Sequence, residues 1–118
     1  MGTPRLAIKR IYEPAAAGDG LRILVDRIWP RGIAKAEAGL DDWCREIAPS
    51  TGLRRWFGHE TERWEEFRRR YAAELKQNHA AVEALRAQLR GRHATLLYAA
   101  KDENHNNAVV LREFLLRH

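Results

Sequence analysis

The chain has 118 residues, 45% hydrophobic and 31% charged, which is typical of one globular domain, so we expect a single domain over residues 1–118. One cysteine, Cys44, excludes an internal disulfide, and no apolar run is long enough for a membrane span or a signal peptide. We therefore expect a cytoplasmic protein without a membrane partner, and its net charge of +5 admits anionic partners.

Two β-strands are predicted first. Residues 6–12 alternate in a strand-like pattern that ends at Glu13 and Pro14. Residues 21–27 form the second strand, whose apolar centre indicates burial on both faces. The connection is short for a helical crossover, so the relative direction of the two strands stays open.

The middle of the chain is predicted to be helical. Leu40, Trp43 and Ile47 have the spacing of one helical stripe, which predicts a short helix ending at Ala48-Pro49. Ser50 is predicted to cap a second short helix that stops at Gly58.

Two further helices, a strand and a last helix complete the prediction. Thr61 is expected to cap a longer helix, and a further helix ends at Gly91. Residues 94–100 form the third strand, and residues 106–116 form the last helix. The apolar positions of the two central helices are Trp64, Phe67, Tyr71, Leu75, Val82, Leu85 and Leu89.

This order predicts an α/β fold. We expect a small, mainly parallel sheet of three strands or slightly more, flanked by helices, with a helical insertion between the second and third strands. Ligands bind at the carboxyl ends of strands in such sheets, so the segments after the second and third strands are the candidate site.

The segment after the second strand combines two arginines with a tryptophan. Arg27 and Arg31 offer guanidinium groups suited to carboxylate or phosphate oxygens, and Trp29 offers a wall for a pocket. The alternative is structural: Trp29 would cover the core, and Asp26 would pair with Arg31.

The segment after the third strand is polar and leads into a helix. Lys101 and the helix start at Asn106 and Asn107 favour an anion, and His105 or Asp102 would be the general acid or base if catalysis occurs. The alternative is that Asp102 or Asn104 only caps the helix.

Other candidates carry weaker signals. Arg54 and His59 lie near the aromatic pair Trp56-Phe57 and are included as ligand-binding candidates, whereas Cys44 is expected to be a packing residue. The spacing from Asp102 to Glu113 imitates a calcium loop but lacks its glycine, so we expect no metal, and no motif indicates a cofactor.

The densest basic run, Arg68 to Arg70, admits nucleic acid as a partner. Glu65 and Glu66 precede it at helical spacing, so we expect Glu65 to pair with Arg69 and Glu66 with Arg70. The run has no interleaved aromatic residue for stacking bases, which favours a solvated helix face.

Three blocks, within residues 25–32, 48–59 and 97–108, resemble the YeaO-like branch of the domain-of-unknown-function family 488, a bacterial and archaeal family without an assigned activity. Longer members carry Cys-Ala-Glu and Cys-His-Arg elements where this chain has Tyr98-Ala99-Ala100 and His105-Asn106-Asn107. The resemblance implies that a cysteine-based chemistry does not carry over to this chain.

The leading hypothesis is that the chain binds a phosphorylated or other anionic small molecule between the two strand-end segments, with catalysis left open. The alternatives are a nucleic-acid-binding module that uses the basic surface, and a partner-binding domain. The oligomeric state, monomer or homodimer, stays open.

Overall fold

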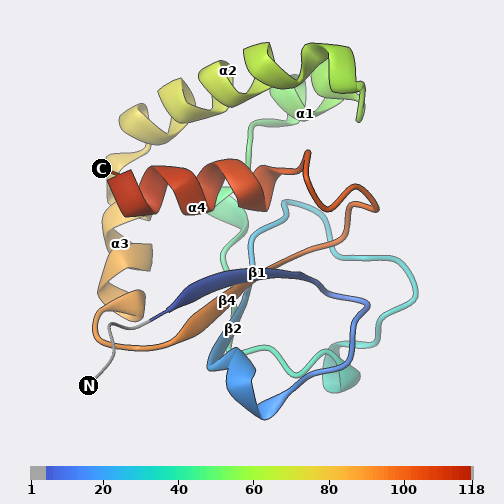
Figure 1. Cartoon of the computed structure of the whole chain (residues 1–118), viewed down its shortest axis with the longest axis vertical. Helices are drawn as coiled ribbons and strands as arrows, with labels where there is room; N and C mark the ends of the chain where they lie inside the picture. The colour runs from blue at the N-terminus through green and yellow to red at the C-terminus, as the bar shows by residue number, and fades with distance from the viewer. Residues whose placement is uncertain (1–4, 118) are drawn as a thin grey trace.

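The computed structural model describes residues 5–117. Within them a parallel sheet has four strands in the order β1-β4-β2-β3. Figure 1 labels three of these strands, β1, β4 and β2. Their bounds are β1 Leu6–Arg10, β2 Leu21–Leu24, β3 Asp42–Trp43 and β4 Ala94–Tyr98. The predicted α/β fold with a small parallel sheet and flanking helices is confirmed. Because the strands are parallel, the carboxyl ends of β2 and β4 meet at one edge of the sheet.

The connection from β1 to β2 is an unusual crossover. Both strands pair with β4 in parallel, although only residues 11–20 join them, and this segment holds a single 3-10 turn at Ala17–Asp19. The turn ends at Gly20, whose φ is 65° and where a Cβ atom would lie 2.2 Å from the His93 carbonyl oxygen. Only glycine fits there, which allows so short a connection without a helix.

An ion cluster holds this crossover in place. The Asp19 carboxylate is buried and contacts Lys9 Nζ at 3.1 Å and Arg22 Nη1 at 2.5 Å. Thr95 of β4 donates its hydroxyl to the Asp19 carbonyl at 2.8 Å. Asp19 therefore ties the crossover to β1, β2 and β4.

The α-helices of the described residues gather on one face of the sheet. They are α1 Thr51–Phe57, α2 Trp64–Gln77, α3 His79–Leu89 and α4 Asn107–Arg117. The last of them, α4, packs on β1 and β4, and α2 packs on α4 and α1. Figure 1 shows α4 lying across the sheet, with α1 and α2 on its far side. Among residues 5–117, no helix is long and apolar enough to cross a membrane.

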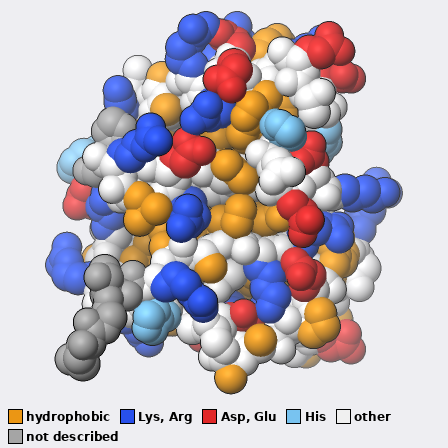
Figure 2. All heavy atoms as spheres, viewed as in Figure 1, with side chains coloured by type: hydrophobic (Ala, Val, Ile, Leu, Met, Phe, Trp, Pro, Cys, Tyr) orange, Lys and Arg blue, Asp and Glu red, His pale blue; other side chains and the backbone are white. Residues whose placement is uncertain are grey.

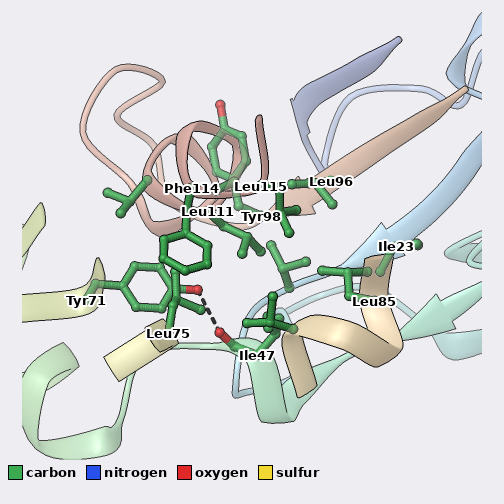
Figure 3. Packing of buried hydrophobic residues seen from close by; sticks show 14 of the residues in the cluster. Ile23, Ile47, Tyr71, Leu75, Leu85, Leu96, Tyr98, Leu111, Phe114 and Leu115 are labelled. Carbon is green, nitrogen blue, oxygen red and sulfur yellow. Dashed lines mark hydrogen bonds between the residues drawn. The ribbon is translucent and has the colours of Figure 1, made fainter. Parts of the chain in front are cut away.

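The main core lies between these helices and the sheet. Alternate strand residues point into it, among them Ile23 of β2 and Leu96 of β4, both fully buried (Figure 3). Tyr71 of α2 is also fully buried, and its hydroxyl donates to the Ile47 carbonyl at 2.7 Å. The hydroxyl thus keeps a partner inside an apolar core, which avoids the cost of an unsatisfied polar group.

The other face of the sheet is covered by an irregular segment, where a helix was predicted. Leu40 and Trp43 pack on this face with Leu24, whereas Ile47 belongs to the core on the helical face. The predicted helix through these residues is wrong: the structure has β3 and the 3-10 turns Lys35–Glu37 and Arg45–Ile47. The helical spacing led to a wrong prediction because these apolar side chains pack on opposite faces of the sheet.

The predicted helix boundaries have a mixed outcome. Ser50 caps α1 by accepting from the Leu53 N–H at 3.2 Å, and Gly58 ends α1 in the left-handed conformation, both as predicted. Thr61 is not the cap of α2, since a 3-10 turn at Thr61–Arg63 precedes the helix. The apolar face of α2 is nevertheless as predicted, with Phe67, Tyr71 and Leu75 buried.

Candidate functional site

A cavity of about 740 Å³, here called the strand-end pocket, opens at the carboxyl ends of β2 and β4. This volume is in the range that holds metabolite-sized ligands. Nine of the ten residues that sequence reasoning nominated line the pocket. They are Arg27, Trp29, Arg31, Arg54, His59, Lys101, Asp102, Asn106 and Asn107.

The segment after β2 is fixed by hydrogen bonds to backbone carbonyls. Arg27 donates from Nε to the Pro49 carbonyl at 3.0 Å and from Nη2 to the Ala48 carbonyl at 3.1 Å. The Trp29 indole N–H donates to the Ile33 carbonyl at 2.6 Å, and its ring packs edge-on against Trp43. Much of the donor capacity of Arg27 is therefore used inside the protein, and Trp29 serves both the core and the pocket wall.

The segment after β4 is organised by Asp102. Its Oδ1 accepts from the Asn104 N–H at 2.9 Å and the His105 N–H at 3.0 Å, while Oδ2 lies 2.9 Å from His105 Nδ1. The Asn104 N–H is the main cause that lowers the pKa of Asp102, and His105 adds to it. Asp102 thus remains an acceptor that shapes the loop.

The cap of α4 is Asn106, not Asp102 or Asn104 as the structural alternative held. Asn106 Oδ1 accepts from the Val109 N–H at 3.1 Å, and its Nδ2 donates to the Asp102 carbonyl at 2.9 Å. The side chain is buried and both its polar ends are used. Its contribution to the pocket is therefore to place the start of α4.

His105 is the nominated residue that does not line the pocket. Its ring makes a T-shaped contact with Trp64, with ring centroids 5.1 Å apart, and its Nδ1 faces Asp102. The sequence placed His105 beside the pocket residues but could not show which way the ring turns. The structure therefore does not bring the His105 ring together with the side chains of the pocket.

Asp26 lines the pocket and was not nominated from the sequence, except as a structural partner of Arg31. Among residues 5–117 it makes no ion pair, with Arg31 or any other residue. Its Oδ2 accepts from the Ala99 N–H at 2.9 Å, and its Oδ1 accepts from Asn107 Nδ2 at 3.1 Å. Asn107 also donates to the Val25 carbonyl at 3.0 Å. Asp26 therefore joins the ends of β2 and β4 to the start of α4.

The electrostatic environment of the Asp26 carboxylate differs from that of a carboxylate on the surface. Burial raises its pKa, while the N–H donors from Ala99 and Asn107 and the charges of Arg54 and His59 act in the opposite direction. A sequence signal for this residue existed: an aspartate directly follows the buried run Ile23 to Val25 at a strand's carboxyl end.

The short helix α1 contributes further side chains to the lining of the pocket. It carries Arg54 and the buried Phe57, whose ring stacks on Phe67 with centroids 4.3 Å apart. His59 follows the Gly58 stop with φ of 60°, an uncommon backbone conformation for a residue other than glycine. The capped helix and its tight stop thus set Arg54 and His59 at the pocket.

The pocket has a polar and aromatic floor beneath a basic rim. Asp26, Asn106, Asn107 and the two phenylalanines are buried or half-buried, whereas the side chains of Arg31, Arg54 and Lys101 are exposed. None of these three cations forms a hydrogen bond or an ion pair from its side chain to any of residues 5–117. Nor does that part of the chain hold a group of three or more His, Cys, Asp or Glu side chains fit for a metal ion.

Cys44 lies outside the pocket. It is partly buried against the main core, as expected of a packing residue, and its thiol lies 3.2 Å from Asp42 Oδ2. Burial, together with this carboxylate, raises the pKa of Cys44 to about 12. The thiol is therefore protonated at neutral pH, which makes it a poor nucleophile.

The basic run on α2 is paired with glutamates. Arg68 bridges Glu65 and Glu113 at 3.2 and 2.6 Å, so the expected pairing of Glu65 with Arg69 is wrong. Arg69 and Arg70 both pair with Glu66, the second as expected. Figure 2 shows Lys and Arg side chains interspersed with acidic ones over the visible face, without one basic patch.

A family model described as "Inactive DUF488-N3 subclade" matches residues 5–118. The chain belongs to this subclade. It is 47% identical over 107 residues to "Uncharacterized protein YeaO" of Escherichia coli (strain K12), which covers 91% of this chain and 93% of that protein. It is 42% identical over 112 residues to "Uncharacterized protein Rv3073c" of Mycobacterium tuberculosis (strain ATCC 25618 / H37Rv), covering 94% and 93%. No solved structure shows a significant match.

The resemblance to the YeaO-like branch of the DUF488 family is thereby confirmed, and the function of this family is uncharacterised. At the two positions where longer DUF488 relatives were expected to carry cysteine, this subclade member has Tyr98 and His105. Tyr98 is buried, and burial raises its pKa further above neutrality. Neither residue offers the reactive thiolate that a cysteine could supply.

Proposed function

We propose that this protein binds a small anionic molecule, such as a phosphorylated metabolite, in the strand-end pocket. The observation that carries the proposal is the exposed basic rim: Arg31, Arg54 and Lys101 line one cavity of about 740 Å³, and none of the three forms an ion pair within residues 5–117. By contrast, Arg68 to Arg70 on α2 are paired with glutamates.

The chemistry of the rim suits phosphate or carboxylate oxygens. A guanidinium group presents a planar fork of donors, and a lysine ammonium adds a mobile point charge. Asn106 and Asn107, at the N-terminus of α4, line the same cavity, so the positive end of a helix dipole lies beside it. These groups attract an anion without rearrangement of the fold.

In this proposal the protein binds its ligand without converting it, which distinguishes it from an enzyme. The side chains that line the pocket include no cysteine, serine or threonine among the described residues, and His105 faces Trp64 and Asp102. The description of the subclade as inactive supports the same reading. We therefore propose a ligand-binding role in the cytoplasm.

The test is a titration of the ¹⁵N-labelled protein with inorganic phosphate and with butyl phosphate. We expect amide shifts to concentrate at Arg31, Lys101 and Asn107. A double variant, Arg31→Gln with Lys101→Gln, should weaken binding by about tenfold or more, since a hydrogen bond to a charged group contributes about 1.5 kcal/mol or more.

Arg55→Gln is the matched control. Arg55 is exposed on α1 beside Arg54 but does not line the pocket. This variant loses a cationic guanidinium like that of Arg31 and should bind as the wild type does. Shifts that map outside the pocket, or equal losses in Arg55→Gln and the double variant, would contradict the proposal.

A further inference from the structure

The strand-end pocket holds an acidic group as well as the basic rim. Asp26 lies half-buried at the junction of β2, β4 and α4, whereas Arg31, Arg54 and Lys101 are exposed around it. No cation among residues 5–117 approaches Asp26 closely enough to form an ion pair. A carboxylate that lines a pocket opposes the binding of an anion there, because like charges repel.

The Asp26 carboxylate keeps unused hydrogen-bonding capacity. Each oxygen receives one donor, from the Ala99 N–H on Oδ2 and from Asn107 Nδ2 on Oδ1. A carboxylate oxygen accepts about two hydrogen bonds, so each oxygen has an acceptor position left. These two donors also hold the carboxylate in one orientation, which is the arrangement that favours recognition of a donor group.

Part of the pocket lining is apolar. Phe57 and Phe67 stack on each other and are buried, and Pro30 and Ala99 also line the pocket. Such a wall suits a hydrocarbon spacer between two polar ends of a ligand. The lining therefore combines an acceptor, an apolar surface and a set of cations.

From this combination we infer that the ligand is an amino-bearing anion, with an ammonium group that binds Asp26 and a phosphate or carboxylate that binds the basic rim. The inference rests on the proposed function, because it extends the same pocket. The ammonium would donate to the free acceptor positions of Asp26, and its charge would remove the repulsion between that carboxylate and the ligand.

Matched pairs of ligands test the inference in the unaltered protein. Ethyl phosphate is compared with aminoethyl phosphate, and butyl phosphate with aminobutyl phosphate, by calorimetric titration at neutral pH. We expect at least one amino ligand to bind about tenfold more tightly than its alkyl counterpart, the effect of one charge-assisted hydrogen bond of about 1.4 kcal/mol. Equal affinity within both pairs would overturn the inference and leave anion binding intact.

The Asp26→Asn variant then assigns the preference to one residue. It should lose the preference for the amino ligand and should bind the alkyl phosphate at least as tightly as the wild type does. Glu62→Gln is the control, since Glu62 is exposed, lies outside the pocket and changes the net charge equally. A preference that persists in Asp26→Asn would overturn the assignment to Asp26.

The outcomes separate the two proposals. If no phosphate ligand binds the wild type, the proposed function itself fails. If alkyl and amino ligands bind alike, only the inference about the ligand class fails. The comparison of ligands on the wild type needs no variant, so it remains decisive even if Asp26→Asn does not fold.

Discussion

Two aspartates at opposite ends of β2 show how one residue type takes two roles. Asp19 precedes the strand and contacts both Lys9 and Arg22. Burial acts to raise its pKa, but hydrogen bonds from the Ala16 N–H and from the two cations outweigh burial and lower it. Asp26 follows the strand and has N–H donors but no contacting cation, and burial raises its pKa. The carboxylate that contacts two cations holds the fold, and the carboxylate without a contacting cation remains available for a ligand.

Replacement of Asp19 should have the largest effect. Asp19→Asn leaves Lys9 and Arg22 near each other without a counter-charge, and breaking a buried ion pair by removing one partner typically costs about 3 kcal/mol. Urea unfolding monitored by circular dichroism measures the loss. A loss below about 1 kcal/mol would show that the cluster does not anchor the crossover, and the contrast with Asp26 would disappear.

Replacement of Asp26 should cost much less. In Asp26→Asn the side-chain amide has only one oxygen and cannot accept from both the Ala99 N–H and Asn107, so one hydrogen bond of about 1 kcal/mol is lost. Removal of a half-buried charge offsets part of this loss, because burial disfavours the ionised form. We expect the free energy of unfolding to change by about 1 kcal/mol or less. A loss equal to that of Asp19→Asn would make Asp26 a structural residue.

The pH dependence of stability should differ in sign between the two positions. The lowered pKa of Asp19 gives a stabilisation that is present above the unfolded pKa near 3.8 and is lost as the pH falls through the folded pKa. The raised pKa of Asp26 gives a stabilisation that is greatest below that unfolded value and is lost as the pH rises through the folded pKa.

Urea unfolding from about pH 3 to about pH 7 measures both signs. As the pH falls, the stability difference between wild type and Asp19→Asn should shrink. The difference between wild type and Asp26→Asn should shift in favour of the wild type. Differences that move in the same direction at both positions would refute the contrast.

The sequence predicted the parts of the fold that depend on local patterns. The apolar face of α2, the Ser50 cap and the Gly58 stop follow from neighbouring residues, and each is present in the structure. The strand β3 was missed because it consists of two residues held by pairing with β2. Leu40, Trp43 and Ile47 imitated a helix because distant elements, not the local chain, decide which face each one meets.

The location of the candidate site could be predicted from the sequence, but the orientation and the hydrogen-bond partners of its side chains could not. Two strand-end segments meet in parallel sheets, so Arg31 and Lys101 could be expected on one cavity. The orientation of His105 depends on Trp64, which is far away in the chain. The availability of Asp26 depends on which donors reach it across the sheet, and no spacing rule encodes that.

The position of β4 in the sheet has a consequence for how the chain folds as it is synthesised. Residues 94–98 form the strand that separates β1 from β2, and β1 pairs only with β4 among residues 5–117. Most of the polypeptide must therefore leave the ribosome before the sheet can assemble. Until then β1 has no strand partner, and the edge of β2 that meets β4 is unpaired, so the nascent chain exposes two strand edges that the folded sheet hides.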